Sequence, residues 1–158
     1  MPLHRSRRRF PSLALPDLEG APRPLAAAWA EGEALIAVGH HECRTTREAL
    51  AFVDRIHRRR RAGTGVLLIL QDDARAARAF VSELGLDVPV RLEPDPYPLA
   101  KAIGLDVVPT LFLVERDGGI ALVSEGFRRS DLEAFAKRLG VAGSLFGPDD
   151  VAPAFRPG

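Results

Sequence analysis

The sequence predicts an α/β fold in which a mixed central sheet carries helices on both faces. Two short apolar runs, 35–38 and 66–70, have the length and composition of buried strands, and a helical pattern follows each of them. A strand, a crossover helix and a second strand place the two strands parallel in one sheet. A third run, 110–114, is followed by the turn 116–119 and a return strand at 120–124, which adds an antiparallel hairpin.

The expected helices end where the sequence supplies a stop signal. Four segments have helical patterns that close at a glycine or a charged end: 45–61, 74–84, 97–103 and 131–139. Ser130 and Glu133 have the spacing of a capping box at the start of the last helix. The pair Asp72–Asp73 is interpreted as the cap of the helix at 74–84, without a catalytic role. A short strand is expected at 88–92.

Length and composition indicate one domain with two flanking segments. A chain of 158 residues buries roughly two thirds of its unfolded surface, so it needs no disulfide to fold. We expect a basic N-terminal arm at 1–10, the folded domain at 11–140, and a Gly/Pro-rich C-terminal tail at 141–158 that is partly disordered.

The same totals exclude several classes of partner. The 22 Lys and Arg residues are balanced by 21 Asp and Glu residues, which argues against a nucleic-acid partner. No apolar run is long enough to span a bilayer, so no membrane partner is expected. A single cysteine excludes an intramolecular disulfide. A reducing cytoplasm is the simpler assignment, and a secreted chain without disulfides is the alternative, since it has the same cysteine count.

The only cysteine, Cys43, lies where the first buried strand passes into a helix. At a helix N-terminus the unpaired N–H groups and the positive end of the helix dipole favour an anion, and the thiolate is the form of cysteine that attacks. Arg47 adds positive charge, while Glu42 opposes it. His40 and His41 titrate near neutral pH and can accept a proton. This segment is therefore the candidate reactive site.

Three features of the chain occur in a fixed order. A strand leads into Cys43-Arg-Thr-Thr46-Arg47, Val108-Pro109-Thr110 precedes an apolar strand, and a hairpin turn at 115–119 separates the last two strands. Together they resemble the redoxin branch of the thioredoxin-like fold, the TlpA-like and peroxiredoxin-like proteins. At these three places that family has Cys-x-x-Cys followed by a basic residue, its cis-proline, and its hairpin. The resemblance covers about 11–140.

The chain departs from the family at positions that matter for chemistry. Thr46 stands where the resolving cysteine is expected, and Glu42 replaces the usual aromatic residue. The peroxiredoxin motif is absent, because its Thr and Pro positions hold His40 and Ile36. The Thr46 hydroxyl lies one turn along the helix and can donate to the sulfur, but it cannot attack a mixed disulfide.

The resemblance implies that the bond before Pro109 is cis and that the backbone of Val108 pairs with an extended substrate beside Cys43. The alternative is a trans proline at a strand start, where a missing N–H does no harm. We assign Cys43, Thr46 and Arg47 to catalysis, and Val108, Pro109 and His41 to substrate binding.

One-thiol chemistry is what remains for such a site. Cys43 can form a mixed disulfide with glutathione or a protein, a sulfenic acid as in a one-cysteine peroxidase, or a disulfide-linked homodimer. A non-catalytic peptide-binding module with a relic cysteine is the alternative. His40 and Cys43 have a spacing that suits zinc or copper, but no second Cys or His cluster exists. We therefore predict no metal, and the absence of a Gly-rich phosphate loop predicts no nucleotide cofactor.

Overall fold

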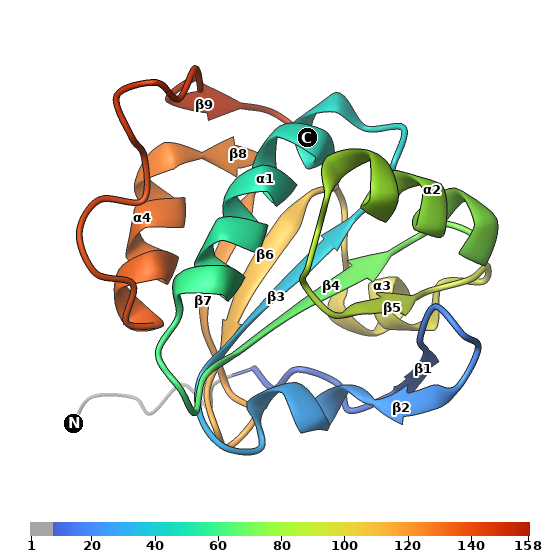
Figure 1. The fold of residues 1–158 in the computed structure, drawn as a ribbon. Helices are drawn as coiled ribbons and strands as arrows, with labels where there is room; N and C mark the ends of the chain where they lie inside the picture. Colours follow the sequence, from blue (N-terminus) through green and yellow to red (C-terminus); the bar gives the residue numbers. More distant parts are fainter. Residues whose placement is uncertain (1–7) are drawn as a thin grey trace.

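The computed structural model describes residues 8–158, and a five-stranded mixed sheet lies at its centre (Figure 1). The strand order is β5–β4–β3–β6–β7. The bounds are β3 Ala34–Gly39, β4 Gly65–Leu70, β5 Val90–Leu92, β6 Thr110–Val114 and β7 Ile120–Glu125. Strands β3, β4 and β5 are parallel, whereas β6 pairs antiparallel with both β3 and β7. The predicted mixed sheet is confirmed.

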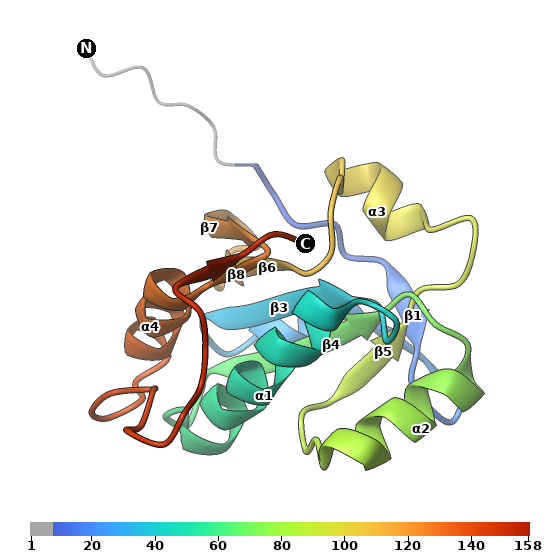
Figure 2. The ribbon, with the colours of Figure 1, turned by 90° about the horizontal axis from the view of Figure 1, so that it is seen from above.

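Helices cover both faces of this sheet, as Figure 2 shows. One face carries α1 (Arg44–Arg59), α2 (Ala74–Leu84) and α4 (Arg129–Arg138); the other carries α3 (Pro98–Ile103) and the short 3-10 helix η1 (Leu25–Trp29). Side chains alternate between faces along a strand, so Leu35 and Ala37 pack toward α1 while Ile36 packs toward η1 and α3. Because both faces are covered, the strands have the continuous apolar sequences that predicted them.

Three helix starts differ from the prediction, and α3 begins at Pro98, one residue later than expected. Helix α1 begins at Arg44 because Cys43 is its N-cap residue. Helix α4 begins at Arg129 and has no side-chain cap, so the capping box predicted from Ser130 and Glu133 is wrong. The N–H of Arg129 donates instead to the carbonyl of Ala154 at 3.0 Å. This partner lies 25 positions away in the numbering, so no local pattern could predict it.

The segment 141–158, expected to be a partly disordered tail, packs against the domain. Three of its apolar side chains are buried in the core cluster that also contains α1 and α4: Val141, Leu145 and Phe146. The ring of Phe146 lies 4.4 Å from that of Phe52, and Arg55 of α1 forms an ion pair with Asp150 at 2.6 Å. Beyond this anchor the chain forms β9 (Phe155–Arg156), which pairs with β8 (Phe127–Arg128).

The N-terminal end of the described chain also joins the fold. Phe10 is buried, its N–H donates to Gly118 at 2.8 Å, and its ring packs edge-on against Trp29 and Phe112. A two-stranded ribbon follows, β1 (Ala14–Pro16) paired with β2 (Pro22–Pro24). Residues 1–7 of the predicted basic arm lie outside the described residues. Within 8–158, no helix has both the length and the apolar character to cross a membrane.

Candidate thiol site around Cys43

The candidate site lies at the edge of the sheet where the parallel strands β3 and β4 end. The loop 40–43 connects β3 to α1, and the end of β3 passes very close to the first turn of that helix. A Cβ placed on Gly39 would lie 2.6 Å from Cγ2 of Thr46, so only glycine fits there. This tight crossing sets the position of Cys43 relative to the strand.

The sulfur of Cys43 lies between a hydrogen-bond donor and an acceptor. As N-cap atom of α1, Sγ accepts from the backbone N–H of Thr46 at 3.4 Å. The thiol in turn donates to the carbonyl oxygen of Val108 at 3.5 Å. The side chain is half-buried, which leaves the sulfur within reach of a reagent. The donor is a contact that stabilises a negative sulfur, whereas the carbonyl favours the protonated thiol.

The Val108–Pro109 peptide bond is cis, as the resemblance implied. Pro109 is buried at the start of β6, and its carbonyl accepts from Gly126 at 2.8 Å. The Thr110 hydroxyl donates to the carbonyl of Val107 at 2.8 Å. These bonds fix the proline loop beside Cys43, which is the arrangement that the sequence predicted for these two segments.

Thr46 is fully buried, and its hydroxyl does not serve the sulfur in the way expected. Its Oγ1 accepts from the N–H of His40 at 3.4 Å, while the group that donates to the sulfur is the backbone N–H. Thr46 therefore positions the loop 40–43 and the helix start. The expectation of a hydroxyl-to-sulfur bond is corrected.

Arg47 is also a positioning residue. Its Nε donates to the carbonyl of His41 at 2.9 Å, and its Nη1 pairs with Glu83 of α2 at 2.9 Å. The guanidinium lies over the ring of Phe80, 5.1 Å from its centroid. Arg47 therefore ties the loop to α2, and its guanidinium is paired with the carboxylate of Glu83.

His40 and His41 meet a buried carboxylate that the sequence analysis assigned only to a helix cap. The side chain of Asp72 is 1% exposed; it accepts from the N–H of His41 at 3.1 Å and contacts the Nδ1 of the same residue. The Nε2 of His40 lies 3.2 Å from Oδ1 of Asp72. Only Asp73 acts as the predicted cap, accepting from Ala76 at 2.8 Å.

A detectable signal for Asp72 was present in the sequence. Asp72 follows directly after the second buried strand, and the carboxyl ends of parallel neighbours meet at one edge of a sheet. His41 was predicted to bind substrate, but its ring is committed to Asp72 and packs edge-on against Phe80. His41 therefore helps to hold the loop 40–43 in place.

The same cluster is the metal-ligating candidate of the described chain. Ligand atoms of His40, His41 and Asp72 lie within 4.8 Å of one another, so Asp72 supplies the carboxylate that sequence reasoning lacked. However, Nδ1 of His40 accepts from the N–H of Glu42 at 3.2 Å. A neutral His40 then carries its proton on Nε2, which points to Asp72 and not to a cation. The geometry is that of an imidazole–carboxylate hydrogen-bond cluster.

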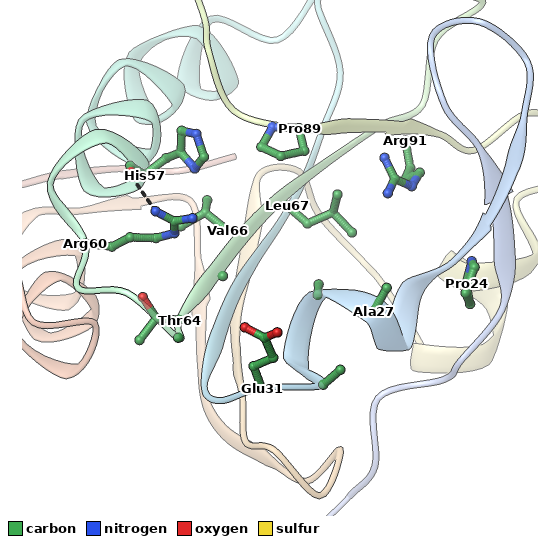
Figure 3. Close-up of a pocket in the computed structure, with 14 residues that line it drawn as sticks. Pro24, Ala27, Glu31, His57, Arg60, Thr64, Val66, Leu67, Pro89 and Arg91 are labelled. Carbon is green, nitrogen blue, oxygen red and sulfur yellow. Dashed lines mark hydrogen bonds between the residues drawn. The ribbon is translucent and has the colours of Figure 1, made fainter.

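The cavity drawn in Figure 3 lies away from the thiol, at the end of the sheet where β3 and β4 begin. Its volume is about 370 Å³, and His57, Arg60 and Arg91 lie in its wall. None of the residues around Cys43 lines it. One side-chain nitrogen of each of these three residues is buried and has no hydrogen-bond partner in the structure of residues 8–158.

No protein-family model matches the chain, and no curated protein matches its sequence. Solved structures do match. One from Chlorobium tepidum, described as a DsbE thiol:disulfide interchange protein, has a TM-score of 0.75 and 22% identity over 84% of this chain and 93% of that chain. The chain has a thioredoxin-like fold.

Two further structures support this fold assignment. A thiol-disulfide oxidoreductase from Bacteroides fragilis has a TM-score of 0.66 and 20% identity, covering 73% of this chain and 89% of that chain. StoA from Bacillus subtilis has a TM-score of 0.65 and 14% identity, covering 81% and 96%. At such identities the likeness establishes the thioredoxin-like architecture and leaves the activity to be argued from the site.

Proposed function

We propose that this thioredoxin-like protein is a thiol–disulfide oxidoreductase that acts through the single cysteine Cys43. The observation that carries the proposal is the position of Sγ, held between the Thr46 N–H of a helix N-terminus and the Val108 carbonyl of a cis-proline loop. The structural neighbours described as thiol:disulfide interchange proteins and thiol-disulfide oxidoreductases support it.

The reaction available to one thiol is a single exchange. Cys43 loses its proton to water and attacks one sulfur of a disulfide, whose S–S bond breaks as a new S–S bond to Cys43 forms. The displaced sulfur leaves as a thiolate. Because Thr46 cannot attack the mixed disulfide, a thiol from outside the chain, such as glutathione, releases the product and restores Cys43. This cycle needs a thiol-rich compartment, and we propose the cytoplasm.

The substrate in this proposal is a disulfide or thiol carried by an extended protein segment or by glutathione. The peptide groups around Val108 lie next to the sulfur, at the start of β6, so an extended segment that pairs with them brings its own sulfur to Cys43. Thr46, Arg47 and the His41–Asp72 pair hold the loop in this position.

Intact-mass analysis after brief treatment with oxidised glutathione tests the proposal. We expect one glutathione adduct on the wild-type protein and none on Cys43→Ser. A second arm replaces glutathione disulfide with hydrogen peroxide, and a single oxygen adduct there would instead support a one-cysteine peroxidase. If Cys43 reacts with iodoacetamide no faster at neutral pH than free cysteine, the thiol is not activated and the oxidoreductase proposal fails.

A non-catalytic peptide-binding module is the second candidate. It is favoured by one observation: an extended part of this chain, β9 and the two residues after it, already reaches the proline loop. Gly158 passes the Val108 carbonyl, and the Thr45 hydroxyl of α1 donates to the carbonyl of Pro157 at 2.7 Å. A module of this kind retains its binding partner when Cys43 is replaced by serine. An oxidoreductase loses its turnover in the same variant.

A further inference from the structure

We propose that residues 153–158 occupy the substrate-docking surface beside Cys43, so that the thiol reacts with a protein only after this segment is displaced. The inference rests on the proposed function for the identity of the displaced substrate. Figures 1 and 2 show the C-terminal end of the described chain running past β8 toward the first turn of α1. Its contacts place it against three parts of the site.

The first part is the edge next to β7, where the segment adds as a strand. Phe127 and Arg128 of β8 pair antiparallel with Arg156 and Phe155. The guanidinium of Arg128 lies over the Phe155 ring, 4.3 Å from its centroid. This is the backbone pairing that strand addition gives an extended peptide, made here by the chain itself.

The second part is the first turn of α1, directly after Cys43. The hydroxyl of Thr45, a buried residue, donates to the carbonyl of Pro157 at 2.7 Å. One turn further, Glu48 accepts from Nε of Arg156 at 2.7 Å. The helix therefore offers the segment one hydroxyl donor and one carboxylate, both on the side that faces the thiol loop.

The third part is the proline loop itself. A Cβ placed on Gly158 would lie 2.3 Å from the carbonyl oxygen of Val108, so the segment passes this oxygen in close contact. The same oxygen accepts from the thiol of Cys43 at 3.5 Å. Gly126 makes the passage possible from the other side, because a Cβ there would lie 2.6 Å from the carbonyl of Arg156. Gly158 and the thiol of Cys43 thus both lie against the carbonyl oxygen of Val108.

The hold on this segment is weak compared with that on the residues before it. Leu145 and Phe146 anchor the chain in the core, but beyond them Val151 is fully exposed and Phe155 is 48% exposed. Most contacts of 153–158 are polar, and the Arg156–Glu48 ion pair is partly exposed, so each of these hydrogen bonds adds little net stability. A segment anchored at one end and lightly held at the other can be exchanged for a competing peptide.

The contacts also indicate which peptide competes best. Glu48 selects a basic side chain, and the space at Val108 selects a glycine two positions later, as Arg156 and Gly158 show. The partner is therefore an extended protein segment with a basic residue followed two positions on by glycine. Its sulfur would lie close to that glycine.

Two substitutions that release the segment test the proposal, with thiol reaction rates as the readout. Gly158→Val places atoms against the Val108 carbonyl, and Arg156→Ala removes the bond to Glu48. Gly147→Ala is the matched control, because its Cβ would meet only Oδ2 of Asp150 at an ordinary 3.5 Å. Each protein is treated with iodoacetamide, which is small, and with a fluorescein maleimide, which is bulky.

We expect both release variants to react with the bulky maleimide about fivefold faster than wild type, the factor that one hydrogen bond is worth. The iodoacetamide rate should change less, and the control should match wild type with both reagents. Equal maleimide rates in all proteins would overturn the proposal. If the release variants react faster with the maleimide but no protein forms a glutathione adduct, residues 153–158 do cover the thiol and the oxidoreductase function fails. The two proposals can therefore fail separately.

Discussion

The two ends of the central sheet differ in how their polar groups are paired. At the end where β3 and β4 finish, the loop 40–43 is held by Asp72, Arg47 and Thr46, and the sulfur of Cys43 has both a donor and an acceptor. At the opposite end, the cavity of Figure 3 contains three buried nitrogens without a partner among residues 8–158. The cavity and the hydrogen-bonded site around Cys43 thus lie at opposite ends of the sheet.

A cavity and a reactive site therefore differ in their structural features. A reacting atom requires neighbours that are fixed before the reaction, which is what buried hydrogen bonds provide. The cavity wall instead presents His57 and Arg91, whose pKa values are lowered chiefly by burial. For both side chains burial disfavours the charged form and outweighs the nearby carboxylates, Asp87 for His57 and Asp17 for Arg91.

The largest effect is expected at the sulfur. Cys43→Ser should abolish all mixed-disulfide formation, because no other thiol exists in the chain. The fold should be retained, since serine is a favourable residue at the N-cap position that Cys43 occupies. Intact mass and urea unfolding measure the two effects. A Cys43→Ser protein that still carries a glutathione adduct would remove the sulfur from the mechanism.

The next effect is expected at the buried carboxylate. Asp72→Ala should lower the free energy of unfolding by about 2–3 kcal/mol, because the His41 N–H and two imidazoles lose a charged acceptor. The control Asp73→Ala removes only a helix cap and should cost about 1 kcal/mol. Urea unfolding of both variants gives the comparison. Equal costs would show that Asp72 has no special role at this end of the sheet.

The parts of this contrast that the sequence could predict are those with local signals. The runs 35–38 and 110–114 are continuous apolar segments, and Cys43 lies between a strand and a helical pattern, so both the sheet and the reactive residue followed from neighbours in the chain.

The rest of the site depends on contacts between residues far apart in sequence. Asp72 meets His41 across 31 positions, and Pro157 meets Thr45 across 112. A helix-cap pattern and a Gly/Pro-rich composition describe Asp72 and the 141–158 segment locally. They carry no information on which distant group each one contacts, so the contacts of Asp72 with the two histidines and of Pro157 with Thr45 were missed.

A pH effect is expected in the segment that reaches the thiol end. The Arg55 guanidinium, followed by the N–H of Gly147, lowers the pKa of Asp150 from 3.8 to about 2. A carboxyl group whose pKa is lower in the folded protein stabilises it above its unfolded pKa and loses this contribution as the pH falls through the folded pKa. Asp150→Asn should therefore be less stable than wild type above about pH 4.

Unfolding curves at several pH values check this expectation. The difference between wild type and Asp150→Asn should shrink between pH 4 and pH 2 and vanish below it, because the wild-type carboxyl is then protonated in both states. The control Asp149→Asn changes a neighbouring carboxylate for which the described structure shows no ion pair, and it should show no such trend. A constant difference at all pH values would contradict the ion pair as its cause.

The smallest effect is expected at the cavity end. Arg91→Met should leave the free energy of unfolding within about 0.5 kcal/mol of wild type or raise it. Among residues 8–158 its Nε is buried without a hydrogen-bond partner, and its Nη1 bonds only to the adjacent carbonyl of Val90 at 2.9 Å. Burial, and then the charge of Arg23, lowers its pKa, so an apolar side chain of similar length removes an unfavourable charge.

Arg58→Met is the matched control for this last substitution. Arg58 donates to the buried carboxylate of Asp54 at 2.7 Å, and losing this bond should lower the free energy of unfolding, because the buried carboxylate loses a charged donor. The two arginine-to-methionine changes are thus expected to differ in sign or size, since Arg58 is more exposed than Arg91 but has a carboxylate partner. A loss above about 1 kcal/mol in Arg91→Met would mean that Arg91 is paired in solution, and the contrast between the two ends of the sheet would disappear.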